Sequence, residues 1–233
     1  MTALWYLVLL GLKMAPEHPQ WRVALIDSGA GERALRAARF AKDGSGPLPA
    51  APDPTGHGSR LASLWSANAP AHTLLLGQVF SDEGPTTPAA VAAAIHWAIG
   101  EQAQLVHLSL GLREDRAWVA VAVARAVKAG LILVAATPAQ GSAVYPAGYP
   151  GVLKATGDAR CEALEISALG ESHFGACVRY PDSFGDTGRG ASVGAGYVTA
   201  AILRLVTPGA GSVALRATLT AAARYHGPER RTG

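Results

Sequence analysis

Residues 190–196, Gly-Ala-Ser-Val-Gly-Ala-Gly, lie directly before the apolar segment Tyr-Val-Thr-Ala-Ala-Ile-Leu-Arg-Leu of residues 197–205. This pattern predicts a buried helix with Ser192 in its first turn. The free N–H groups and the dipole of a helix N-terminus favour negative charge, and small neighbours let another chain approach the hydroxyl. The stretch suits a serine nucleophile, although an ordinary serine cap on a core helix would look the same.

The composition is that of a folded domain with its own core. The chain has 233 residues, of which 49% are hydrophobic and 16% charged, and this excludes a disordered body. The net charge is only +3, and no basic run or aromatic ladder occurs beyond Arg230-Arg231 in a polar tail. We therefore expect no nucleic-acid partner.

Cys161 and Cys177 are the only cysteines. Two cysteines are too few for a disulfide framework, and no metal-ligand spacing surrounds them. We expect free thiols and no metal site.

The N-terminal residues 2–12 form an apolar run that is too short to span a bilayer as a helix. The run lacks the basic region and the cleavage site of a signal peptide, because its nearest charge, Lys13, follows it. It fits a strand, a packing segment, or a start codon placed upstream of the true one at Met14. We expect no membrane span and a cytoplasmic protein.

Strand and helix signals alternate along the rest of the chain. Apolar runs predict strands, and the intervening segments carry helix formers, caps and stops. The predicted strands are 21–26, 73–79, 105–111, 131–136 and 151–156, and the predicted helices are 32–41, one opening at His57, 88–99, 117–129 and 213–224. Alternation of this kind implies an α/β fold: a doubly wound, mostly parallel sheet with helices on both faces.

Two further polar residues occupy positions suited to chemistry. Asp27 follows the first buried strand, at the end where ligands collect in open α/β sheets, although a turn-capping aspartate would also lie there. His57 lies between Gly56 and Gly58 at a helix start, where nothing screens its imidazole. With Ser192 they give the order Asp, His, Ser, which is one of the orders known for serine-protease triads.

Around these residues the sequence resembles the subtilases, the subtilisin-like serine proteases. Residues 23–29 (Val-Ala-Leu-Ile-Asp-Ser-Gly) resemble the aspartate motif, 57–62 (His-Gly-Ser-Arg-Leu-Ala) the histidine motif, and 190–195 the serine motif. The serine motif has Ala191 and Val193 where the family usually has threonine and methionine. Further landmarks at 95–99, 107–111 and 145–147 occur in the family's order, and the resemblance covers about residues 21–210.

The resemblance implies a subtilisin-like fold and a serine endopeptidase that needs no metal or organic cofactor. It divides the chain into an N-terminal apolar segment (1–20), a catalytic domain (21–226) and a polar tail (227–233). The implied catalytic residues are Asp27, His57 and Ser192. An extended peptide or protein substrate would pair with Ser109, Leu110 and Gly111 on one side and with Gly84, Pro85 and Thr86 on the other. The implied pocket for the residue before the cut is lined by Ala135, Ala136 and Thr137, which are small and uncharged.

The chain departs from the family pattern at the oxyanion site. Where the family carries an asparagine whose amide donates to the oxyanion, this chain has Pro138, which has no donor. Losing one such donor costs about 3–4 kcal/mol of transition-state stabilisation, so we expect slow turnover unless Thr137 or Gln140 substitutes.

The chain is also short for the family. Only 26 residues precede Asp27, so we expect a compact protein without a prodomain. We find no clear acidic calcium loop, and we interpret Asp82-Glu83 as a solvated turn.

The small size and the altered oxyanion site are similar to those of the maturation proteases of quinohemoprotein amine dehydrogenase. This similarity implies a leader-bearing partner such as the small gamma subunit of that enzyme. Two other functions stay open: a pseudoprotease that binds and chaperones an extended peptide without cutting it, and a hydrolase that acts on esters.

Overall fold

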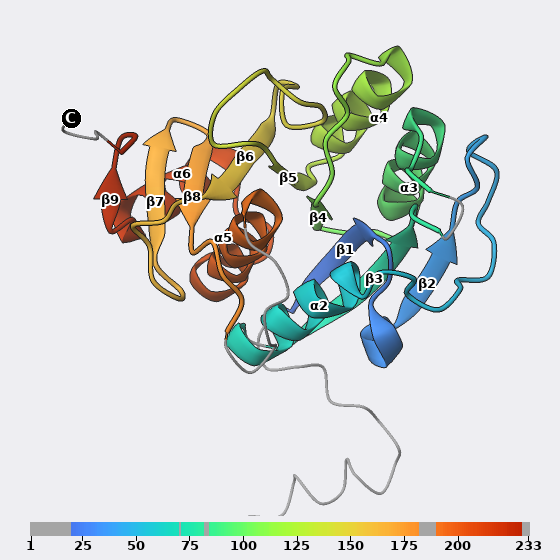
Figure 1. Ribbon diagram of the computed structural model, residues 1–233, viewed down its shortest axis with the longest axis horizontal. Helices are drawn as coiled ribbons and strands as arrows, with labels where there is room; N and C mark the ends of the chain where they lie inside the picture. Colours follow the sequence, from blue (N-terminus) through green and yellow to red (C-terminus); the bar gives the residue numbers. More distant parts are fainter. Residues whose placement is uncertain (1–19, 70, 82–83, 182–189, 230–233) are drawn as a thin grey trace, which may run out of the picture.

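The computed structural model describes residues 20–69, 71–81, 84–181 and 190–229. Its centre is a nine-stranded sheet in the order β2-β3-β1-β4-β5-β6-β8-β7-β9 (Figure 1). The strands are β1 Trp21–Asp27, β2 Arg36–Arg39, β3 His72–Gln78, β4 Leu105–Leu108, β5 Ile132–Ala136, β6 Val152–Gly157, β7 Ile166–Gly170, β8 His173–Ala176 and β9 Tyr225–His226. Only the β7–β8 pair is antiparallel, so the predicted mostly parallel sheet is confirmed.

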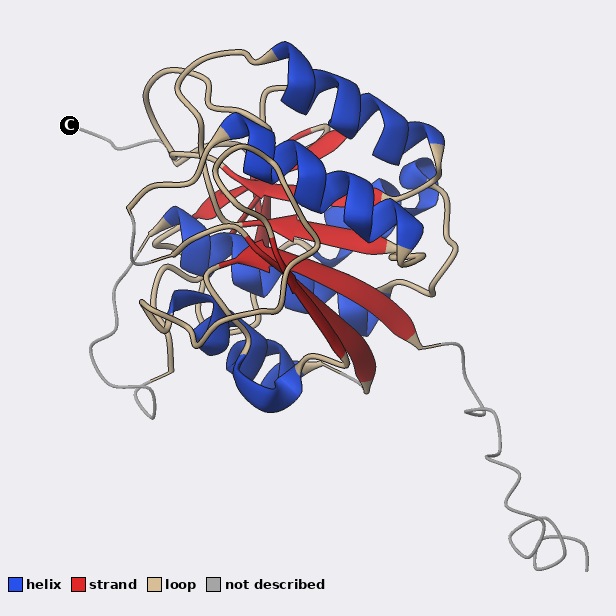
Figure 2. Cartoon of the chain, turned by 90° about the vertical axis from the view of Figure 1, so that its right-hand side faces the viewer, coloured by secondary structure: helices blue, strands red, loops and turns tan. Residues whose placement is uncertain are grey.

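Helices cover both faces of the sheet (Figure 2). The helices are η1 Gly31–Arg33, α2 His57–Asn68, α3 Pro88–Gly100, α4 Ala117–Lys128, α5 Ala191–Leu205 and α6 Ser212–Ala222. One core joins α2, α5 and α6 to the sheet, and a second core joins α3 and α4 to the opposite face. This is the predicted doubly wound α/β class.

The central strand β1 supplies side chains to both cores. Val23 and Leu25 belong to the core under α2 and α5, whereas Ala24 and Ile26 belong to the core under α3 and α4. Because successive side chains of a strand point to opposite faces, a strand buried on both sides reads as a continuous apolar run. That is why the sequence of β1 identifies it.

The predicted helix at 32–41 is wrong. The chain forms the short helix η1 there, followed by the edge strand β2, which pairs in parallel with β3. Ala38 and Phe40 are buried, two residues apart, while Leu35 is 67% exposed. Pairing with the free edge of β3 outweighs the helix propensity of the alanines and arginines.

Three other sequence-based expectations concern the cysteines, a membrane span and two segments of the chain. Cys161 and Cys177 are free and buried, as predicted. No helix among the described residues is long and apolar enough to cross a membrane. The apolar run at 2–12 and the predicted turn at Asp82-Glu83 lie outside the described residues.

Helix α5 lies very close to the sheet at Gly194 and very close to α2 at Gly196, because these two residues have no side chain. A Cβ on Gly194 would overlap the carbonyl group of Thr156 in β6, and a Cβ on Gly196 would come within 2.7 Å of the Leu61 side chain in α2. Interiors are packed too densely for such atoms to be added without moving their neighbours.

We predict that Gly194→Ala destabilises the fold by about 2 kcal/mol, because the new methyl group pushes α5 away from β6. Urea unfolding followed by circular dichroism measures the change. Gly100→Ala is the matched control: it lies at the end of α3, nothing lies within 4 Å of its Cβ position, and the variant should be as stable as wild type or slightly more so. Equal stability of the two variants would contradict the close contact.

Candidate active site

Asp27 and His57 form a hydrogen-bonded pair at the carboxyl end of the sheet. Asp27 is the last residue of β1 and is 1% exposed, and His57 is the first residue of α2. The Nδ1 atom of His57 lies 2.8 Å from Oδ1 and 3.0 Å from Oδ2 of Asp27. Because Nδ1 faces the carboxylate, Nε2 is the ring nitrogen left for a second partner.

The pair favours a protonated imidazole. Burial disfavours the charged ring, but the hydrogen bond to Asp27 and the negative charge of Asp27 outweigh burial and raise the pKa of His57 above its ordinary value. A histidine held this way accepts a proton readily and keeps it while the carboxylate is ionised.

The two glycines beside His57 are required by the backbone conformation and by close backbone packing. Gly56 is the N-cap of α2 and has a φ of 68°, in the left-handed region that favours glycine. A Cβ on Gly58 would overlap the backbone of Gly29, directly after the aspartate motif. The glycines thus bring the start of α2 against the end of β1, which sets the distance between His57 and Asp27.

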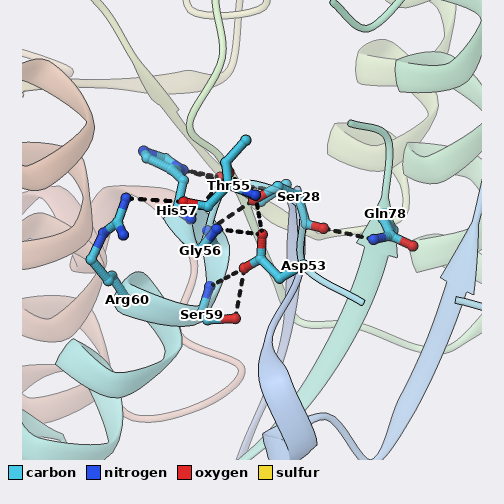
Figure 3. A network of polar contacts seen from close by, with 10 residues as sticks. Ser28, Asp53, Thr55, Gly56, His57, Ser59, Arg60 and Gln78 are labelled. Atoms are coloured by element: carbon cyan, nitrogen blue, oxygen red, sulfur yellow. Dashed lines mark hydrogen bonds and ion pairs between the residues drawn. The ribbon is translucent and has the colours of Figure 1, made fainter. Parts of the chain in front are cut away.

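Polar residues around the pair form a network that the sequence reasoning missed (Figure 3). The backbone N–H and the hydroxyl of Ser28 both donate to Asp27 Oδ1, at 2.7 and 3.1 Å. The carboxylate of Asp53 accepts the N–H groups of Gly56 and Ser59 at 2.8 and 3.0 Å. Asp-Pro-Thr-Gly before a helix is a typical turn signal, and it was the available clue to Asp53.

Ser192 is the second residue of α5, and its neighbourhood is fixed by the packing of α5 on α2. The indole N–H of Trp65 in α2 donates to the carbonyl oxygen of Gly196 at 2.9 Å. The predicted nucleophile lies one turn before Gly196, and His57 lies two turns before Trp65.

A second contact orders the two helices. His107 of β4 is fully buried, hydrogen-bonds Thr199 of α5 at 2.8 Å, and contacts the Trp65 ring at a centroid distance of 5.0 Å. Burial lowers the pKa of His107 to about 3, so its ring is neutral. Together the contacts lead us to expect the first turns of α2 and α5 on the same side of the molecule; the assignment of Ser192 stays a prediction.

The N-terminus of α5 suits an anion. Its N-cap residue is Gly190, and no side chain of the described residues caps the helix. The N–H groups in the first turn of a helix favour a negatively charged group.

The segment after β5, at the predicted oxyanion site, offers few donors. The N–H of Thr137 donates to the carbonyl oxygen of Ala155 in β6 at 2.8 Å, so it is already used. Pro138 has no N–H, and it is exposed together with Gln140. Among the side chains of residues 137–140, the hydroxyl of Thr137 and the amide of Gln140 are donors.

The predicted substrate-binding residues follow strands on both sides of β1. Ser109, Leu110 and Gly111 follow β4, and Leu112 pairs with Tyr145. Thr86 and Pro85 follow β3 and precede α3, and Gly84 makes an isolated bridge with Ser81. Since β1 lies between β3 and β4, the two segments flank the strand that ends at Asp27.

The predicted pocket residues lie at the end of β5. Ala135 and Ala136 are its last two residues and are buried, while Thr137 is half-buried. No cluster of three or more metal-ligating side chains occurs in the part of the chain that the structure describes.

Comparison with known proteins identifies the family. The model of the subtilase family, Peptidase S8, matches residues 15–173, which is more than half of the chain. The chain belongs to the subtilase family. The matched range holds Asp27 and His57 and ends before Ser192.

Individual relatives support the same assignment. A thermostable alkaline protease of Halalkalibacterium halodurans is 34% identical over 144 residues, which is 57% of this chain and 40% of the relative. The subtilisin-like protease het-Q2 of Podospora anserina is 33% identical over 107 residues, which is 42% of this chain and 29% of the relative. The chain thus matches less than half the length of these curated relatives.

Among solved structures, the epidermin leader peptide processing serine protease EpiP of Staphylococcus aureus has a similar fold. It aligns with a TM-score of 0.51 and 20% identity, over 63% of this chain and 48% of EpiP. The subtilisin-like fold predicted from the sequence is therefore confirmed.

We predict that Asp27→Asn lowers the pKa of His57, because it removes the negative charge that, together with the hydrogen bond, outweighs burial. An NMR titration of the histidine ring protons measures the pKa. The wild-type value should lie above 6.5, the ordinary value for histidine. An unchanged pKa in the variant would contradict the hydrogen-bonded pair.

Proposed function

We propose that the protein is a serine endopeptidase in which Asp27, His57 and Ser192 form the catalytic triad. The observation that carries the proposal is the Asp27–His57 pair at the start of α2, with Ser192 on the first turn of the neighbouring helix α5. Membership of the subtilase family supports it.

The chemistry follows from the atoms of these side chains. The Ser192 Oγ attacks the peptide carbonyl carbon while its proton moves to Nε2 of His57, and the negative charge of Asp27 stabilises the imidazolium. His57 returns the proton to the leaving amine as the C–N bond breaks, which leaves an acyl-enzyme. Water, deprotonated by His57, then releases the second product and restores Ser192.

The tetrahedral oxyanion would be held by N–H groups at the start of α5. We take the N–H of Ser192 itself as one of these donors, since Ser192 lies in the first turn of the helix. With Pro138 at the position of the family asparagine, we assign the second donor to the hydroxyl of Thr137 or the amide of Gln140. The proposed enzyme is therefore slow.

As substrate we propose the leader region of a partner protein in the cytoplasm. The name of EpiP describes leader peptide processing for that protein. In this chain the segments at 84–86 and 109–111 flank the strand that ends at Asp27, and an extended peptide that pairs with both would pass that residue. The gamma subunit of quinohemoprotein amine dehydrogenase stays our specific candidate. Incubating purified subunit with the protein, and measuring a shortened mass, tests that partner.

A second candidate function is peptide binding without cleavage. It is favoured by the oxyanion segment, where Pro138 has no N–H and the N–H of Thr137 already donates to Ala155. Binding of a leader peptide that stays intact over many hours would support this alternative.

We predict that a fluorophosphonate probe labels the protein and that Ser192→Ala abolishes the labelling. The activated hydroxyl attacks phosphorus, and the adduct is detected by intact mass. Labelling should slow as the pH falls through the raised pKa of His57, because the imidazole must be neutral to accept the proton.

Thr199→Ser provides a labelling control, since it keeps a hydroxyl on α5 at a buried position far along the helix. Labelling that persists in Ser192→Ala would contradict the assignment of the nucleophile. Absence of labelling in the wild type, with and without the partner peptide, would favour the binding function.

We further predict that Pro138→Asn raises the labelling rate about tenfold or more, because it returns an amide donor to the position where the family carries one. Pro138 is exposed, so the substitution should be tolerated. Ala139→Asn places the same side chain one residue further along the exposed segment and should leave the rate unchanged. Equal rates in the two variants would argue against an oxyanion role for position 138.

A further inference from the structure

Asp53 receives four hydrogen bonds from the turn that carries His57. Its Oδ1 accepts the N–H groups of Thr55 and Gly56 at 3.2 and 2.8 Å. Its Oδ2 accepts the N–H and the hydroxyl of Ser59 at 3.0 and 2.6 Å. One carboxylate therefore binds the chain on both sides of His57.

A second set of bonds connects this turn to Asp27. The hydroxyl of Thr55 accepts the N–H of His57 at 3.2 Å and donates to the hydroxyl of Ser28 at 3.0 Å. The Ser28 hydroxyl lies 3.1 Å from Asp27 Oδ1 and accepts the N–H of Gly58 at 3.1 Å. The backbone of His57 and the carboxylate that binds its ring are thus joined through two hydroxyls (Figure 3).

The loop that carries Asp53 is itself fixed to the sheet. Gln78, the last residue of β3, is 1% exposed, and its side chain donates to the carbonyl oxygens of Ser28 and Ala51 at 2.7 and 3.1 Å. The side-chain amide oxygen of Gln78, Oε1, accepts the N–H of Ala51 at 2.8 Å. The buried side chain of Gln78 thus holds the loop at Ala51, two residues before Asp53.

Asp53 is also a second negative charge beside the imidazole. Although burial works against ionisation, the hydrogen bonds from Ser59 keep the pKa of Asp53 below its ordinary value, so the group is charged at neutral pH. Among the described residues, the charged and titratable groups that interact electrostatically with His57 are Asp27 on β1, Asp53, Arg60 on α2 and His107 on β4. Tyr180 interacts with Asp27. The charge of Asp53 favours the imidazolium, and the charge of Arg60 opposes it.

We propose that Asp53 is a positioning residue for the reaction: its carboxylate fixes the turn that presents His57 and, through Thr55 and Ser28, the orientation of the Asp27–His57 pair. This role rests on the proposed endopeptidase function. Asp53 touches no reacting atom and acts through His57.

The test compares Asp53→Asn with Asp43→Asn in the full-length protein. Asp43 is the matched control because it also accepts a backbone N–H within its own turn, from Ser45 at 2.8 Å, but it lies on an exposed loop away from His57. Three quantities are measured for each variant: the pKa of His57 by NMR, the rate of fluorophosphonate labelling, and the melting temperature.

In Asp53→Asn we expect labelling to slow by about tenfold or more and the pKa of His57 to fall. Arg60→Gln, which removes the opposing charge, should move the pKa of His57 upward. Asp43→Asn should change neither the pKa nor the labelling rate.

A lower melting temperature with an unchanged pKa and labelling rate would overturn the proposal and leave Asp53 as a helix cap only. If Asp53→Asn does not fold, Ser59→Ala decides, because it removes the 2.6 Å hydroxyl bond to Asp53 and changes no atom of the Asp27–His57 pair. Wild-type labelling speed and pKa in Ser59→Ala would then overturn the proposal. If the wild type does not label at all, the endopeptidase function fails, whereas the NMR titration still decides the role of Asp53.

Discussion

The close contact of α5 with β6 and α2 is the constraint on which the site depends. Gly194 brings the backbone of α5 against the carbonyl of Thr156, and Gly196 lets Leu61 and Leu64 of α2 pack against the helix. A side chain at either position would move the first turn of α5 relative to His57. The small residues around Ser192 are thus needed for packing as much as for access to the hydroxyl.

The sheet explains why distant residues meet. In parallel strands, the carboxyl ends lie at one edge, and β1 is the strand between β3 and β4. β1 therefore ends, at Asp27, inside that edge, and the loops after β3 and β4 lie on either side of it. Fixing His57 against Asp27 then requires only that the start of α2 approach Gly29, which Gly58 permits.

The sequence predicts this fold well where a strand is buried on both faces. β1 and β5 are continuous apolar runs, and no helix signal competes with them. The helix predicted at 32–41 fails because Ala and Arg carry a helix propensity that pairing with β3 overrides. The strands β7, β8 and β9 are short and rich in small or polar residues, so no hydrophobic pattern in the sequence predicts them.

The sequence predicts some residues of the candidate site and not others. Asp27 and His57 were found from ordered motifs, and their hydrogen bond was then found in the structure. Asp53 was missed because its importance lies in the contacts of its turn with Ser28 and Gln78, which are 25 residues away from it on either side in the sequence. A turn signal predicts where a chain bends, but the residue that the bend is held against depends on the tertiary fold.

The oxyanion segment and the Asp27–His57 pair make opposite contributions to the proposed reaction. The pair is fully formed, with a buried carboxylate that accepts bonds from His57 and from Ser28, so the proton-transfer half of the machinery is in place. The donor half is weak, because Pro138 carries no N–H and the N–H of Thr137 is bound to Ala155. In the proposed reaction such a site would depend on its substrate to bring the segment at 137–140 into position, since a bound peptide backbone can reorder an exposed loop. Selectivity for one partner would then follow from the slow step itself, because only a peptide that reorganises this segment would be cut at a useful rate.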